Sequence, residues 1–354
     1  MKYKLEKRPE QNPWLQALAI LIGLVAALGV SSILIISAGA RVGEALTAIF
    51  NGSFGDWDSF AETLVQATPL IFCGMAIVIA FRARVFNIGA EGQFFAGAMV
   101  AILVAMNLDF LPRPILLFAI VLGAMVGGAI WGGIPGFLKA RFNANEIITT
   151  VMMNYIIMFF LSYLLSSVWR EPGHFFLQTA RIPEAAQLPV VAAGTRLHLG
   201  FVLSLISGLF AYLLLWKTPL GYEIRAVGIN PVAARYKGIS IKRITILTML
   251  ISGAIAGLAG GSEVVGLHFR LRLDISTGYG YTAIIIALLG RLHPIGVVIA
   301  AIFFGALVNG STSMQIITGV PVALVYCVEA IVLIFVLSAD IISRYRIRRV
   351  RDVE

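Results

Sequence analysis

The sequence predicts an all-α fold, a polytopic membrane bundle of about ten spanning helices (eight to ten), with both termini in the cytoplasm. Of the 354 residues, 59% are hydrophobic and only 13% are charged, about half the charged share of a typical soluble domain. The mean hydropathy is +0.92, and apolar runs of about 20 residues, enough to span a hydrocarbon core, recur along the chain. The net charge of +9 does not indicate nucleic acid as a partner, because basic residues in short loops orient helices in a bilayer.

The first apolar run follows a basic segment of residues 1–13. This run, 14–37, is longer than the apolar region of a cleavable signal peptide, which has about 7–15 residues. We therefore expect an uncleaved first span. Cys73 and Cys327 lie inside apolar runs, so we expect free thiols rather than a disulfide framework.

The remaining spans follow from the other apolar runs. The predicted spans are 14–37, 62–81, 93–107, 114–138, 147–168, 199–216, 244–266 and 318–338. Between the last two lies 281–309, which is interrupted by a polar turn at 291–294. The interruption predicts two short pieces, either a tight pair of spans or a re-entrant hairpin.

Loop charge predicts which side of the membrane each end faces. If the spans alternate, the basic segments 1–13 and 341–354 and the basic loop 217–243 fall on one side, which the positive-inside rule assigns to the cytoplasm. The loop 169–198 is then external, although it also contains arginines. We expect one permeation domain, 14–340, between the two cytoplasmic segments.

Glycines at four-residue spacing fill two of the predicted spans. Gly128 and Gly132 belong to one such series, and Gly253 and Gly257 belong to another. This spacing lets helix backbones approach closely. It fits either general packing within the bundle or movable helices at a subunit interface.

A short polar helix is predicted within the loop 217–243. Asn230 can cap its start, Pro231 suits the first turn, and Gly238 fits a left-handed stop, which predicts a helix over 231–237. A helix of this length is marginal alone in water, because isolated helices need about 12–15 residues. Three supports are open: the membrane surface, the chain's own loops, or a partner that contacts the shared face of Val232, Arg235 and Tyr236.

This stretch resembles the cytoplasmic coupling loop of ATP-binding-cassette (ABC) importer permeases, which has an Ala-Ala-x-x-x-Gly core. Here Ala233, Ala234 and Gly238 supply the core, and Val232 stands where the family has Glu. The resemblance implies a coupling helix that docks on a separate ATPase subunit. The implied coupling residues are Asn230, Pro231, Val232, Ala233, Ala234, Arg235, Tyr236, Lys237 and Gly238.

Further strings narrow the resemblance to one branch of this family. The segments 67–70, 85–93, 143–147, 278–284 and 290–294 resemble those of permeases that import nucleosides with basic-membrane-type lipoproteins, and the likeness covers nearly all of 40–340. The branch implies a nucleoside permease, with simple sugars such as ribose as the alternative cargo. It implies an ABC ATPase, a second permease chain (a copy or a relative), an external substrate-binding lipoprotein and a small polar substrate, in the lipid of a prokaryotic plasma membrane.

No phosphate-binding GxxxxGK[ST] motif occurs, so we expect ATP and Mg²⁺ on the partner ATPase and no cofactor on this chain. An enzyme is not indicated either. No H-E-x-x-H occurs, the four histidines are scattered without a predicted metal site, and Ser262 is not part of a nucleophile elbow. An ion-coupled secondary transporter remains the alternative of another class, since Glu263 and Glu329 could couple to an ion.

Polar and aromatic residues inside the spans are the candidates for a substrate path or gate. Ionisable groups in a span are costly and therefore functional suspects, while amides and aromatic faces suit a hydroxyl-rich substrate. For Glu91 we expect a structural role, either a salt bridge to Arg82 or Arg84 or an acid at a helix start that fixes the fold. Interhelical hydrogen bonding is the alternative role for Asn154. The candidates are Asn87, Glu91, Gln93, Phe95, Asn154, Tyr155, Glu263, Asn309 and Glu329.

Overall fold

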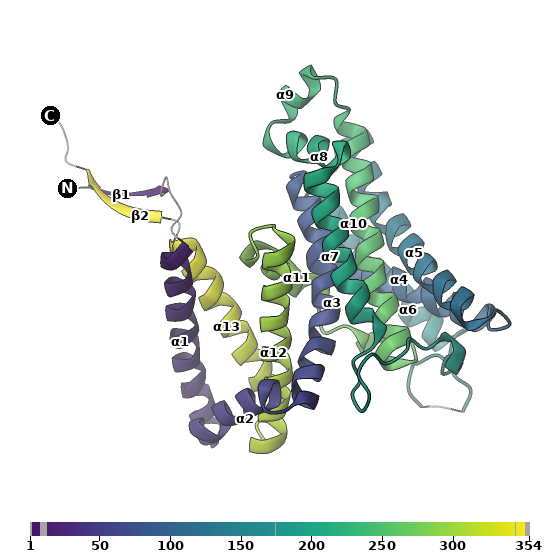
Figure 1. Cartoon of the computed structure of the whole chain (residues 1–354), viewed down its shortest axis with the longest axis horizontal. Coiled ribbons are helices and arrows are strands. Elements are labelled where there is room, and N and C mark those ends of the chain that lie inside the picture. Colours follow the sequence, from purple (N-terminus) through teal and green to yellow (C-terminus); the bar gives the residue numbers. More distant parts are fainter. Residues whose placement is uncertain (1, 8–12, 174, 344, 351–354) are drawn as a thin grey trace. The chain divides into compact units, whose positions relative to one another are not determined.

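The computed structural model describes residues 2–7, 13–173, 175–343 and 345–350 (Figure 1). Regular structure in these ranges is almost entirely helical, which confirms the all-α part of the predicted fold class. Strands β1 (Lys2–Lys7) and β2 (Tyr345–Val350) pair in an antiparallel ribbon. The sequence does not predict this ribbon, because it joins segments from the two ends of the chain. Residues 1, 8–12, 344 and 351–354 of the two predicted basic segments lie outside the described residues.

The helices follow the predicted spans closely. In chain order they are α1 (Pro13–Ser37), α2 (Val42–Phe54), α3 (Trp57–Arg82), α4 (Ala90–Asn107), α5 (Arg113–Phe142), α6 (Glu146–Ser166), α7 (Leu199–Lys217), α8 (Pro219–Ile229), α9 (Pro231–Tyr236), α10 (Ile241–Glu263), α11 (Tyr279–Leu289), α12 (Pro294–Thr318) and α13 (Val322–Ser343). Short 3-10 turns lie at Glu184–Ala186 and Leu273–Ile275, and a π-helical turn at Val264–His268 continues α10.

Within the described ranges, seven helices are long and apolar enough to cross a membrane, or eight if the bent pair α1 and α2 forms one span. The chain bends by 119° between the two helices of that pair. The region 281–309 differs from the prediction of two short pieces. There α11 has 11 residues, about half of what a hydrocarbon core requires, but α12 has 25 and is long enough to span.

The chain groups into two compact units, and each is described by itself. Unit 2, residues 61–305, is centred on α4, α5 and α10. The predicted glycine series meet in this unit: a Cβ on Gly128 would lie 2.2 Å from the Gly253 carbonyl oxygen, and a Cβ on Gly257 would lie 2.3 Å from that of Ala124. These two glycine faces therefore pack against each other within one chain, and not at a subunit interface.

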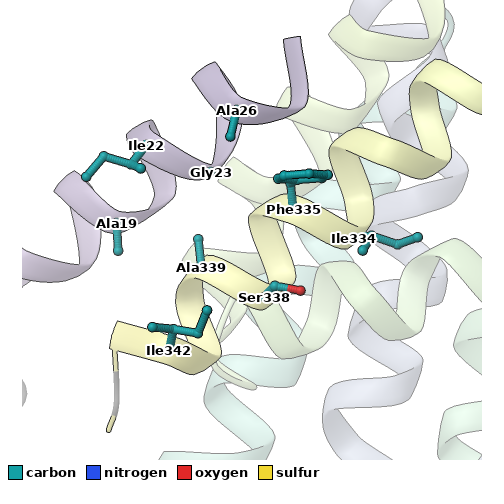
Figure 2. A pocket seen from close by; sticks show the side chains of 9 residues that line it. All are labelled: Ala19, Ile22, Gly23, Ala26, Ile334, Phe335, Ser338, Ala339 and Ile342. Carbon is teal, nitrogen blue, oxygen red and sulfur yellow. The ribbon is translucent and has the colours of Figure 1, made fainter. Parts of the chain in front are cut away.

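Unit 1 comprises residues 1–60 and 306–354, and in it α1 packs on α13. The two helices cross closely at Gly23, where a Cβ would lie 2.7 Å from that of Ala339. Figure 2 shows the apolar groove of about 440 Å³ that opens beside this crossing, with Ile22, Phe335 and Ile342 among its lining side chains. Its lining suits hydrocarbon contact, as expected for helices in a bilayer.

The two cysteines are free thiols, as predicted. Cys73 is buried in α3, and Cys327 is exposed on α13.

Candidate functional site

The predicted polar helix is present as α9, at one end of unit 2 beyond the ends of α7 and α10 (Figure 1). Its start is capped as expected: the Asn230 Oδ1 atom accepts hydrogen bonds from the backbone N–H groups of Val232 (3.0 Å) and Ala233 (3.1 Å). Pro231 occupies the first helical position, where an N–H group would have no partner within the helix.

The end of α9 is also set by its own sequence. Gly238 adopts a left-handed conformation with φ of +82°, and the Ile239 N–H group donates to the Ala234 carbonyl at 3.1 Å. This pattern is a glycine helix stop. The helix ends at Tyr236, one residue before the predicted Lys237, which becomes the C-cap.

One face of α9 packs against other helices of the chain, and the opposite face is exposed. Ala234 is buried where α9 packs on α8 and α10, whereas Val232 is 62% exposed and Tyr236 is 89% exposed. A groove of about 400 Å³, lined by Arg225 and Lys237 among others, separates α8 from α9. The chain's own helices therefore provide one of the three supports considered, and they leave the predicted partner-facing side chains accessible.

A second set of candidates forms a buried amide cluster at the start of α4. The Asn87 and Gln93 side-chain amides donate to each other at 2.9 and 3.0 Å, and the Asn87 Nδ2 group also donates to the Ser252 hydroxyl at 2.8 Å. Ser252 donates in turn to the Ala76 carbonyl at 2.7 Å. The segment before α4 is thereby tied to α3 and to the middle of α10. Sequence reasoning did not identify Ser252, since a lone serine in an apolar span gives no signal.

Asn154 extends this cluster to α6 and α11. Its Oδ1 atom accepts from the Gly92 N–H group at 2.9 Å, and its Nδ2 group donates to the Ile88 carbonyl and to the Tyr281 hydroxyl, both at 3.0 Å. The oxygen and the amino group of this amide are both bonded to the protein, which is interhelical bonding of the kind considered as the alternative role.

The predicted partner of Glu91, Arg82 or Arg84, is wrong. The Glu91 Oε2 atom accepts a hydrogen bond from the Gly280 N–H group at 2.7 Å, in the first turn of α11. The guanidinium of Arg82 instead donates to the Leu292 carbonyl at 3.0 and 2.9 Å and lies over the Trp216 ring. An unpaired helix N-terminus attracts a carboxylate, and α11 begins inside the bundle where Glu91 can reach it. Glu91 therefore joins two helix starts, those of α4 and α11.

Glu263 is the buried acid whose surroundings are least complete. It is 1% exposed, its nearest basic side chain is His268, whose Nε2 atom lies 3.6 Å away, and neither carboxylate oxygen has a hydrogen-bond partner among the described residues. Burying such a group without partners is costly, which marks it as a functional candidate.

A chain of polar contacts that sequence reasoning missed lies in the same unit. The Tyr279 hydroxyl contacts the Gln66 Oε1 atom at 3.3 Å, the Gln66 amide donates to Glu62 at 3.4 Å, and Glu62 is paired with Arg196 at 2.6 Å. A polar pair four residues apart at the start of α3, Glu62 and Gln66, was the available signal.

The other candidates do not join these clusters. Phe95 is buried edge-on against Phe94, and Tyr155 is 51% exposed on the outer side of α6. Asn309 belongs to unit 1, where its amide donates to the Gly52 and Ser59 carbonyls at 2.7 and 2.9 Å. Glu329 falls within α13, but its side chain lies outside the described residues.

Comparison with known proteins identifies the family. Residues 59–337 match the family described as "Branched-chain amino acid transport system / permease component". The glucose ABC transporter permease protein of Haloferax volcanii is 35% identical over 98% of this chain and 94% of its own length. The guanosine ABC transporter permease protein of Bacillus subtilis is 38% identical over 90% of this chain and 92% of its own.

The nucleoside ABC transporter permease protein of Lactococcus lactis is 32% identical over 94% of this chain and 93% of its own length. No solved structure gives a significant match. Such permeases are the non-catalytic transport components of their systems, and the ion-coupled secondary transporter is thereby excluded. The chain belongs to the family of branched-chain amino acid transport system permease components and is a multi-pass permease subunit of an ABC transporter.

Proposed function

We propose that this chain is the permease subunit of an ATP-driven importer of nucleosides in the plasma membrane of a prokaryote. A separate ABC ATPase holds ATP and Mg²⁺, an external lipoprotein delivers the substrate, and a second permease, a copy or a relative, completes the path. The observation that carries the proposal is α9, a helix of six residues with locally satisfied ends and an exposed face that includes Val232 and Tyr236.

The proposed topology has about ten crossings, with α9 and both termini in the cytoplasm and the loop 169–198 outside. Because α11 is too short to span and begins beside Glu91, we assign the whole stretch 264–289 to one crossing, of which only α11 is α-helical. Broken crossings of this kind are typical of transporter sites. Residues 14–340 then form the permeation domain.

In the proposed mechanism, closure of the ATPase displaces α9, and α8 and α10 transmit the movement to the bundle. The residues that couple to the ATPase are Asn230 to Gly238. Ser252 on α10 is bonded to Asn87, so movement of α10 reaches the amide cluster and the Glu91 contact with Gly280. Glu91 then acts as a gate between α4 and α11, while Glu263, whose carboxylate oxygens accept no hydrogen bond from the described residues, is available to the substrate.

Site-directed crosslinking tests the coupling role. A Tyr236→Cys variant is made in a Cys327→Ser background, because Cys327 is exposed and Cys73 is buried. In intact cells we expect crosslinks from position 236 to the ATPase subunit. A Phe110→Cys variant is the control, since Phe110 is 75% exposed in the turn between α4 and α5. If neither position 236 nor position 110 crosslinks to the ATPase in a complex that still imports substrate, the coupling role of α9 is rejected.

Uptake assays test the cargo. A strain that lacks this chain should lose uptake of radiolabelled guanosine and uridine and regain it on complementation. The glucose permease of Haloferax volcanii favours a simple sugar as the second candidate. Loss of ribose or glucose uptake with nucleoside uptake unchanged would establish that alternative. The purified subunit alone should not hydrolyse ATP.

A further inference from the structure

The end of unit 2 that carries α9 also contains a basic cavity of about 520 Å³, distinct from the groove between α8 and α9. Its cationic lining comes from three helices: Lys139 and Arg141 from the last turn of α5, Arg235 from α9, and Lys242 from the first turn of α10. Four cationic side chains on one cavity repel one another unless an anion is present.

Among the described residues, one of these four charges has an acidic partner. Glu146 lies 2.5 Å from the Lys139 ammonium group. For Arg141, Arg235 and Lys242 the described part of the chain provides no ion pair. Three uncompensated positive charges therefore line the cavity.

The start of α10 adds a further positive contribution. Ser240, its N-cap residue, lines the cavity, and its hydroxyl accepts from the Arg243 N–H group. The other first N–H groups of a helix have no partner within it, and the helix dipole adds partial positive charge there. Together with the three cations, this arrangement suits a phosphate group.

The neighbouring surface indicates where the phosphate comes from. Phe137 and Phe142 at the end of α5 are 52% and 68% exposed, and Ile148 at the start of α6 is 58% exposed. Exposed apolar side chains beside a basic cavity fit a molecule with acyl chains and an anionic head. Two of the free cations, Arg141 and Lys242, lie on membrane-spanning helices rather than on α9, which favours a lipid over an acidic face of the ATPase.

We propose that this cavity binds the phosphate-bearing headgroup of an anionic phospholipid, with the acyl chains along α5 and α6. The site goes beyond the transport function: it fixes the position of α9 relative to the ends of α5 and α10 through Arg235. Free phosphate or a nucleotide shares the headgroup's chemistry but not the apolar contacts.

Native mass spectrometry of the purified full chain tests the site, with phosphatidylglycerol and phosphatidylcholine of identical acyl chains as probes. The variant Arg141→Gln with Lys242→Gln removes two of the free charges and leaves α9 untouched. We expect its affinity for phosphatidylglycerol to fall roughly 10- to 30-fold, since each basic residue near an anionic lipid contributes about 1 kcal/mol. Affinity for phosphatidylcholine should change little.

The matched control is Arg243→Gln, because Arg243 neighbours Lys242 on α10 but does not line the cavity. It should bind phosphatidylglycerol like the wild type. The charge-conserving variant Arg141→Lys with Lys242→Arg should also retain binding, which separates loss of charge from misfolding. Equal affinity of the double Gln variant and the wild type, or an equal loss in Arg243→Gln, overturns the proposal.

Two further measurements distinguish a lipid headgroup from a soluble phosphate and from a contact with the ATPase. Inorganic phosphate or AMP at millimolar concentration should not displace phosphatidylglycerol; displacement that depends on Arg141 and Lys242 assigns the site to a soluble phosphate and overturns the lipid assignment. In the whole complex, loss of the ATPase from the double Gln variant with unchanged lipid binding identifies the cavity as a protein contact and also overturns it.

Discussion

The coupling helix and the amide cluster are built in opposite ways. Every hydrogen bond that defines α9 joins residues within 230–239, so the helix is specified by its own neighbours in the sequence. The bonds of Asn87 to Ser252 and of Asn154 to Gly92 join residues 165 and 62 positions apart. One region is a local structure with an exposed face, and the other exists only when the whole bundle is assembled.

This difference separates two requirements of a transporter. A surface that meets a partner must keep its shape without support from that partner, and local caps provide this. A buried hub must hold several helices in register, and it does so with polar groups whose partners lie on other helices. Damage to the hub should therefore lower stability, whereas damage to α9 should lower transport alone.

The largest effect is expected from Asn87→Leu, which breaks the hub. It leaves the Gln93 amide, the Gly89 N–H group and one bond of Ser252 without partners. At about 1–3 kcal/mol for each buried unsatisfied group, we expect a loss of roughly 3–6 kcal/mol, seen as a lower Tm in detergent. The control is Asn107→Leu, since the side chain of Asn107 is exposed and, among the described residues, bonds to the Leu103 carbonyl alone. An unchanged Tm for Asn87→Leu would show that the cluster does not hold the bundle together.

A pH titration compares α9, which contains no Asp, Glu or His, with another buried part of unit 2, the start of α7. His198, at the start of α7, is 1% exposed, and burial lowers its pKa from 6.5 to about 4. The unfolded chain therefore takes up a proton as the pH falls below about 6.5, while the folded chain does not until about pH 4.

Stability from His198 should then be complete above pH 6.5 and fall by up to about 3 kcal/mol on acidification to pH 4. In His198→Asn, which can still accept from the Gly200 N–H group, this part of the pH dependence of Tm should disappear. The same slope in both proteins would assign the dependence to other groups.

A smaller effect on stability, but a large one on transport, is expected from Gly238→Val. The left-handed conformation costs a side-chain-bearing residue about 1–2 kcal/mol, and a helix of six residues has few backbone hydrogen bonds to oppose unwinding. Uptake should be lost while Tm and membrane insertion stay close to the wild type. Gly39→Val carries the same strain, with φ of +81° and open space around it, at a site outside the coupling loop. Equal uptake by the two variants would contradict a special role for position 238.

The smallest expected effect comes from removing the caps. Asn230 and Asn145 each accept from two backbone N–H groups, at the starts of α9 and α6. Replacement by Ala should cost about 1 kcal/mol at either site. We expect Asn145→Ala to lower Tm slightly and keep uptake, and Asn230→Ala to reduce uptake several-fold at unchanged Tm. The reverse pattern would show that α9 is held by its packing rather than by its cap.

Features that depend on residues close together in the sequence could be predicted from it, whereas features that depend on distant residues could not. The apolar runs determined the spanning helices, and Asn230, Pro231 and Gly238 determined α9 to within one residue, since helix length and caps depend on neighbours along the chain. The free thiols followed from the same apolar runs.

Only the tertiary structure decided the partners of the buried polar groups. Glu91 was expected beside Arg82 because the two side chains carry opposite charges and lie near each other in the sequence. Instead, Glu91 bonds to the backbone of Gly280, and Arg82 bonds to that of Leu292. The sequence also could not predict that α11 is short, or that the Glu263 oxygens have no hydrogen-bond partner among the described residues. A buried polar group binds whichever donor or acceptor the fold brings to it, and in this chain that group lies up to 257 residues away.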